Sequence, residues 1–198
     1  MRLDAGRVLI FDLEARPTAW IGGDFVGRTS TAYAYSYLDE DKVVSDVIRA
    51  GDHGYWVELV EDIADKVENA TLPVGHWIRG FDLPLLNADL ERIGEPSLSR
   101  TLTIDTKTDR MQGDGISQSL ENLASRYDLT TQKMTMHEPW WEEFNLWQTE
   151  RTRELVRERV ESDVRATKEL YLAMDEAGRL KAPAIWDPSK AKLSRYRR

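Results

Sequence analysis

Two carboxylates one residue apart, Asp12 and Glu14, follow an apolar run near the start of the chain. Residues 8–11 are aliphatic, β-branched or aromatic, which is typical of a short buried strand. Side chains in a strand alternate between faces, so Asp12 and Glu14 are expected to point the same way. Adjacent carboxylates repel each other unless a cation lies between them, and hard cations such as Mg²⁺ prefer oxygen ligands. The pair is therefore a candidate divalent-metal site, with a polar strand end that reaches solvent as the alternative.

A third carboxylate, Asp163, falls inside an apolar stripe. Residues 148–176 are predicted to form a long helix, whose stripe comprises Val156, Val160, Thr167, Leu170, Tyr171 and Met174. At about 100° per residue, Asp163 lies within about 20° of Val156. A lone carboxylate facing the core is costly unless it is paired or ligates a metal. A salt bridge from Arg159, one turn earlier, is the alternative to a metal shared with other carboxylates.

Two more Asp residues are candidates for the same site. Asp82 opens a helix predicted over residues 81–93, where Asp is also common as a cap, so capping is the alternative function. Asp105 ends a short strand predicted within residues 99–106. The ends of strands are where the functional sites of α/β proteins collect.

The elements that must position these carboxylates follow from the periodicity of the chain. Strands are predicted at residues 8–11, 31–38 and 42–44, with residues 17–29, which hold a proline and three glycines, as an irregular connection. An amphipathic helix over 54–69, a strand at 72–76 and a helix over 119–127 complete the pattern. Strands come first and then alternate with helices. The fold class predicted is α/β, with a mixed sheet, antiparallel for the first three strands and then parallel, flanked by helices.

Length and composition suit one compact domain. The 198 residues, 41% hydrophobic and 31% charged, are enough to bury a core. We expect residues 1–178 to form the domain and residues 179–198 a basic C-terminal tail, which contains Lys190, Lys192, Arg195, Arg197 and Arg198. No stretch approaches the roughly 20 apolar residues of a membrane span, and the chain has no cysteine, so no membrane partner and a cytoplasmic location are expected.

The net charge of −8 argues against a general polyanion binder, which would show a basic surface. Carboxylates gathered around metal ions, however, count as negative in the sequence and are neutralised in the working site. The acidic balance is therefore compatible with a metal-dependent enzyme that acts on nucleic acid.

Taken in order, these motifs resemble the DEDD superfamily of 3′–5′ exonucleases, which have a ribonuclease H-like fold. The resemblance covers roughly residues 7–174 and rests on the segments 11–14, 76–85, 104–106, 119–123 and 163–171. It is closest to predicted exonucleases of bacteriophages and bacteria, related to the proofreading domains of DNA polymerases. It implies that Asp12, Glu14, Asp82 and Asp163 are the catalytic, metal-binding positions and that Asp105 supports the site. It also implies the cytoplasm of a bacterial or phage-infected host cell.

The resemblance further implies phosphodiester hydrolysis with two Mg²⁺ or Mn²⁺ ions about 4 Å apart. The substrate expected is the 3′ end of single-stranded or fraying DNA, with RNA as a further candidate, and a replication or repair protein is a candidate partner. Trp77 and the aromatic segment 139–144 could stack unpaired bases, with core or lid packing as the alternative. Cationic residues that could contact phosphates are Arg79, Lys107 and Lys133. Asp105 and Arg159 complete the residues assigned to the substrate side of the site.

One departure from the family pattern concerns the residue that activates water. Proofreading members have a Tyr four residues, or a His five residues, before the last Asp, where this chain has Arg159 and Glu158. Arg is not a base, because its pKa exceeds about 12, and Glu158 is predicted on the far side of the helix. His76, His137 or the metal ions are then left to activate the water.

Three alternatives to an exonuclease follow. The departure favours a nucleic-acid-binding or interaction module that keeps the fold without turnover, although all four carboxylates are retained. A phosphatase built on an Asp-x-Asp strand end is disfavoured, because Glu14 replaces the second Asp. An endonuclease of the ribonuclease H type is the third.

Overall fold

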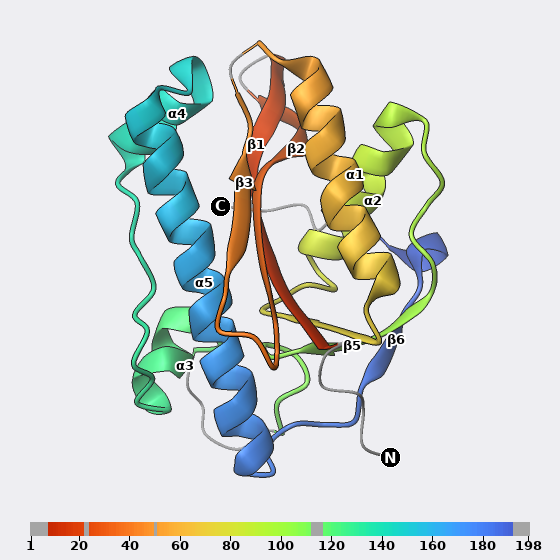
Figure 1. Ribbon diagram of the computed structural model, residues 1–198, viewed down its shortest axis with the longest axis vertical. Helices are drawn as coiled ribbons and strands as arrows, with labels where there is room; N and C mark the ends of the chain where they lie inside the picture. Colours follow the sequence, from red (N-terminus) through yellow and green to blue (C-terminus); the bar gives the residue numbers. More distant parts are fainter. Residues whose placement is uncertain (1–7, 22–23, 50, 112–116, 192–198) are drawn as a thin grey trace.

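A six-stranded mixed sheet lies between two layers of helices in the computed structural model, which describes residues 8–21, 24–49, 51–111 and 117–191 (Figure 1). The strands are β1 (Val8–Ile21), β2 (Asp24–Tyr37), β3 (Val44–Val47), β4 (Leu72–Gly75), β5 (Thr101–Asp105) and β6 (Ala184–Trp186), in the spatial order β3-β2-β1-β4-β5-β6. The first three are antiparallel, β4 is parallel to β1 and to β5, and β6 is antiparallel to β5. The predicted α/β mixed sheet, antiparallel first and then parallel, is confirmed.

Helices cover both faces of this sheet. The helices α1 (His53–Asn69) and α2 (Asp82–Ile93) lie on one side, and α5 (Glu150–Glu176) lies on the other with α3 (Leu120–Arg126) and α4 (Glu138–Trp147) beside it (Figure 1). A single turn, η2 (Pro188–Lys190), follows β6. Among the described helices, none is both long and apolar enough to cross a membrane.

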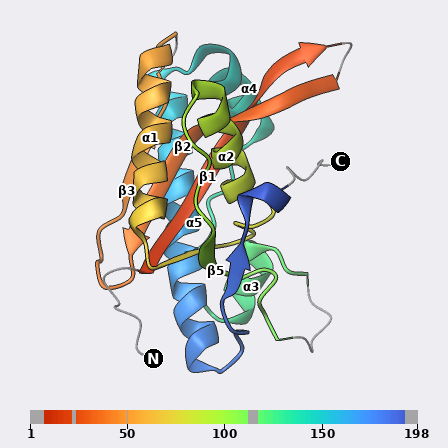
Figure 2. The ribbon, with the colours of Figure 1, turned by 90° about the vertical axis from the view of Figure 1, so that its right-hand side faces the viewer.

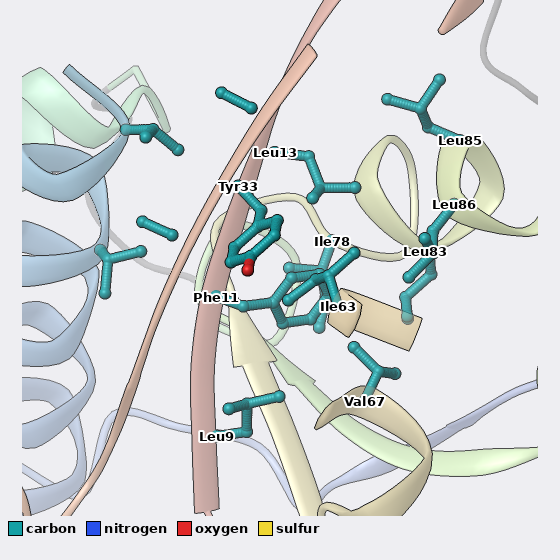
Figure 3. Close-up of a cluster of buried hydrophobic side chains, with 14 of the residues drawn as sticks. Leu9, Phe11, Leu13, Tyr33, Ile63, Val67, Ile78, Leu83, Leu85 and Leu86 are labelled. Atoms are coloured by element: carbon teal, nitrogen blue, oxygen red, sulfur yellow. The ribbon is translucent and has the colours of Figure 1, made fainter. Parts of the chain in front are cut away.

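Strand β1 supplies side chains to both layers. Leu9, Phe11 and Leu13 point toward α1 and α2, where they meet Ile63 and Leu83 (Figure 3). Because side chains alternate along a strand, the residues between them face α5. The apolar face of α5 packs there through Val156, Val160 and Val164, all fully buried. Asp12 and Glu14 therefore share the α5 face, as the sequence predicts.

The prediction of an irregular connection at residues 17–29 is wrong. Strands β1 and β2 instead continue as one long antiparallel hairpin, with pairs from Leu9↔Tyr37 to Ile21↔Asp24 and a register shift between Glu14 and Ala15 (Figure 2). Pro17 does not break the ladder with β2, because among the described residues β4 pairs with β1 only over Val8–Ile10 and no other strand pairs with that edge of β1 at Pro17. The open edge tolerates a residue without an N–H.

Two other boundaries differ from the sequence prediction. The third strand lies at 44–47 rather than 42–44 and pairs with residues 32–35 of β2. Strand β6 lies within the segment assigned to the basic tail, so part of that segment belongs to the sheet. Of the basic residues named for the tail, Lys190 lies in η2, and Lys192, Arg195, Arg197 and Arg198 lie outside the described residues.

Candidate functional site

Three of the predicted carboxylates come together between β1 and α5. Each of Asp12, Glu14 and Asp163 offers an oxygen, and these oxygens lie within 4.8 Å of one another. Asp163 is only 3% exposed, as its place in the apolar stripe predicts, whereas the other two are partly exposed. The group therefore opens toward the surface from a buried base.

Two cations neutralise part of this group. Arg159 donates from Nε to Glu14 Oε1 at 2.5 Å, and its Nη2 lies 3.8 Å from Asp163 Oδ2. The salt bridge between Arg159 and Asp163 is thus present, but the shorter contact joins Arg159 to a residue 145 positions earlier. Lys133 Nζ lies 3.0 Å from the same Asp163 oxygen. The sequence indicates Lys133 only as a candidate phosphate contact and carries no local signal for its pairing with Asp163.

The remaining atoms fit a hard cation. Asp163 Oδ1 is buried and has no hydrogen-bond partner among the residues that the structure describes. Burial, followed by the charges of Asp82, Asp163 and Glu14, raises the pKa of Asp12 well above its ordinary value. Burial likewise raises the pKa of Glu14, against the opposing effect of Arg159. Mutual repulsion around an unsatisfied oxygen is the situation that a divalent metal ion relieves.

Asp82, the fourth predicted ligand, is not one of the three members of this group, although its charge acts on Asp12. Its Oδ1 accepts a hydrogen bond from the backbone N–H of Leu13 at 2.9 Å, beyond the point where β4 stops pairing with β1. Burial raises the pKa of Asp82 to about 8, and the charges of Asp105 and Glu14 add to the effect. Asp82 thus fixes the strand that carries Asp12 and Glu14 and adds its charge to theirs, and its role as a metal ligand stays a prediction.

Asp105 holds the turn that follows β4. Its carboxylate accepts hydrogen bonds from the backbone N–H groups of Trp77 at 2.9 Å, Arg79 at 3.3 Å and Lys107 at 3.0 Å. Arg79 also turns inward, because its guanidinium pairs with Asp109 and donates to Thr108 Oγ1. The structure gives both residues internal partners, so a direct contact with substrate stays a prediction for them.

Trp77 occupies a strained backbone position in the turn after β4. Its φ of 74° lies in the left-handed region, which a bulky residue adopts rarely and mostly at functional sites. The Trp77 ring lies nearly parallel to the Phe81 ring, with 6.2 Å between their centroids, and Lys107 Nζ lies 4.1 Å from the Trp77 centroid. Gly80 makes room for this arrangement, since a Cβ there would lie 2.3 Å from the indole nitrogen.

The three candidate bases, Glu158, His76 and His137, differ in burial and in their contacts. Glu158 is exposed, as predicted. Burial, with the charges of Lys107 and Lys133, lowers the pKa of His76 to about 4, and its Nδ1 lies 3.0 Å from Thr106 Oγ1. His137 is exposed at the start of α4, in edge contact with Trp140. None of the three is shown to reach the carboxylate group.

The aromatic segment 139–144 forms part of α4, a helix that the sequence analysis did not predict. Trp141 lies 5.5 Å from the Arg159 guanidinium and in edge contact with buried Phe144. Trp141 and Phe144 therefore pack against other parts of the protein, which fits lid and core packing, the alternative to base stacking.

Comparisons with known proteins identify the fold. Among the solved structures that match is a family B DNA polymerase from the hyperthermophilic archaeon Pyrobaculum calidifontis, with a TM-score of 0.59 and 18% sequence identity. The match covers 86% of this chain and 24% of that chain, so this chain spans about a quarter of the polymerase's length. At this identity the similarity shows the fold alone, and the predicted ribonuclease H-like fold class is confirmed. No family model and no curated protein matches the chain.

Proposed function

We propose that the chain is a metal-dependent 3′–5′ exonuclease that hydrolyses phosphodiester bonds at single-stranded or fraying ends of DNA, with RNA as a second substrate class. The observation that carries this proposal is the group of Asp12, Glu14 and Asp163 with its buried, unpartnered oxygen. The order of motifs that resembles DEDD exonucleases and the fold similarity to a DNA polymerase support it. A replication or repair protein is the proposed partner.

The three carboxylates, with Asp82 adding its charge, would hold divalent ions, Mg²⁺ or Mn²⁺. Such ions stabilise charge that develops on phosphate oxygens and lower the pKa of water, and two is the number that the resemblance implies. Arg159 is cationic and Glu158 is exposed, so neither expected place holds a buried base, and His76, with a pKa of about 4, is a weak base. We therefore expect activity to depend strictly on added metal.

The substrate end would be received beside Trp77. The parallel rings of Trp77 and Phe81 are both partly exposed, and an unpaired base would stack on one of them by displacing the cation, Lys107 or Arg28, that lies over it. Lys107, beside the Trp77 ring, adds positive charge for a backbone phosphate. This combination suits a flexible single strand better than a duplex.

The first experiment follows DNA and RNA single strands labelled at the 3′ or the 5′ end, with Mn²⁺ or with EDTA. We expect stepwise removal of nucleotides from the 3′ end with Mn²⁺ and none with EDTA. Asp163→Asn should reduce the rate by about a hundredfold or more, the scale of losing one charge-stabilising group. Asp175→Asn, an exposed change on the same helix, should leave the rate unchanged.

The outcomes separate the competing functions. Strand binding without any metal-dependent cleavage would replace the proposal with a binding module on the same fold. Internal fragments that precede terminal nucleotides would indicate an endonuclease. Equal rates for Asp163→Asn and Asp175→Asn would place any observed activity outside this site.

A further inference from the structure

Arg159 is held rigidly inside the carboxylate group. Besides its contacts with Glu14 and Asp163, its Nη1 donates to the Met134 carbonyl at 2.9 Å, and its guanidinium lies 5.5 Å from the Trp141 ring centroid. The side chain is only 17% exposed. Four partners from four segments of the chain define one orientation, so the positive charge is a fixed part of the site.

Lys133 adds a second fixed charge on the same side. Both cations approach Asp163 Oδ2, Lys133 at 3.0 Å and Arg159 at 3.8 Å. Within the described part of the chain, Asp163 Oδ1 is the oxygen left without a partner. Both cations therefore lie at one oxygen of Asp163, and the other oxygen is left for a ligand.

Charge balance limits what that ligand can be. Asp12, Glu14, Asp82 and Asp163 lie within one another's field, with Lys133 and Arg159 among them. Fully ionised, four carboxylates and two cations leave two negative charges, which one divalent ion neutralises. A second divalent ion would face the Arg159 guanidinium at close range, and like charges repel strongly where solvent screening is weak.

We infer that Arg159 and Lys133 act as built-in counter-ions in place of one metal ion, so that this site binds a single divalent ion with appreciable affinity. The inference rests on the proposed function and departs from the two ions that the resemblance implies. It also assigns Arg159, in the position of the family's Tyr, as a positioning residue that fixes Glu14.

The test counts bound metal, independently of nuclease activity. Metal-free protein is titrated with Mn²⁺, with calorimetry reporting bound ions and electron paramagnetic resonance reporting free ones. We expect one ion per wild-type chain, with any second ion bound at least about a hundredfold more weakly. Arg159→Met should bind two ions, the second at least about tenfold more tightly than in the wild type. Arg157→Met, whose arginine pairs with Glu154 away from the site, should match the wild type.

Several results would overturn the inference. Two ions bound by the wild type with similar affinities would do so without any variant, and so would an Arg159→Met protein that still binds one. If circular dichroism shows that Arg159→Met does not fold, Lys133→Met is titrated instead, and an unchanged second site would count against the inference. A wild-type chain that binds no Mn²⁺ would refute the proposed function as well, whereas two strong ions would leave that function standing.

Discussion

Arg159 stands where the resembling exonucleases have a Tyr, and its contacts give it a task other than proton transfer. Its charge is satisfied by Glu14, and burial is outweighed by Glu14 and Asp163, so that the pKa of Arg159 is raised. At this scale the site is an electrostatic arrangement. Two cations pair with carboxylates that repel one another, and the unpaired Asp163 oxygen is left for a metal ion.

The stability of the metal-free protein should fall as pH rises, because these carboxylates are protonated in the folded chain and lose their protons at higher pH. Burial raises the pKa of Asp82 from 3.8 to about 8 and raises the pKa of Asp12 as well. Between those values the folded chain binds more protons than the unfolded chain, so raising the pH favours unfolding. Chemical denaturation without metal, at pH steps across this window, should show the decline.

Asp82→Asn provides the comparison, since Asn keeps the acceptor for the Leu13 N–H but cannot ionise. The decline should be shallower in this variant and unchanged in Asp175→Asn. Mn²⁺ should restore stability most at the alkaline end, because it binds the ionised carboxylates. A stability that rises steadily with pH in metal-free wild type would contradict this account.

At the scale of elements, the segment at residues 130–136 carries Lys133 and is tied to α5. Glu169 accepts four hydrogen bonds from it, from the backbone N–H and hydroxyl groups of Thr130 and Thr131. Ser162 Oγ accepts a further one from the Met134 N–H at 3.1 Å. The position of the Lys133 charge therefore depends on α5 as much as on its own segment.

Glu169→Gln should loosen this segment. Burial alone would raise the pKa of Glu169, but the bonds from Thr130 and Thr131 outweigh it and hold the pKa below its ordinary value of 4.5. The stabilisation is therefore present above that value and is lost as pH falls through the lower folded value. Urea unfolding at neutral pH should show a loss of about 1–3 kcal/mol for the variant.

The control is Glu176→Gln, an exposed change on the last residue of α5, which should leave the midpoint near that of the wild type. At acid pH, where Glu169 is protonated, the gap between Glu169→Gln and the wild type should close. A gap that persists unchanged in acid would show that the carboxylate charge is not what holds the segment.

At the scale of the whole molecule, β6 closes the sheet from outside the stretch that carries the motifs. Trp186 pairs with Thr101 and is 5% exposed, whereas its neighbour Ile185 is 59% exposed. One core residue, Trp186, thus lies in the segment that the sequence predicts as a tail.

Trp186→Ala should therefore destabilise the whole domain, by about 3–5 kcal/mol, as expected for the loss of a buried aromatic side chain. Ile185→Ala on the same strand should change stability by about 0.5 kcal/mol or less, because its side chain is largely exposed. Thermal and urea unfolding measure both variants. Similar, small effects for the two would support a tail that contributes nothing to the fold.

The sequence by itself determined the features that depend on neighbours along the chain. The strand that places Asp12 and Glu14 on one face, the stripe that buries Asp163 and the helices near residues 54–69 and 81–93 all follow from local periodicity. The proline and glycines at residues 17–29 wrongly predicted an irregular connection, because whether a proline interrupts a strand depends on which edge of the strand is paired.

The tertiary structure alone decided which charges meet. Arg159 pairs with Glu14 across 145 residues, Lys133 reaches Asp163 from a loop, and Asp82 supports β1 rather than joining the three clustered carboxylates. Local pattern gives the face on which a side chain lies. Its partner is set by the rotation of α5 against the sheet and by the point at which β4 stops pairing with β1, and both are fixed only when the two layers pack.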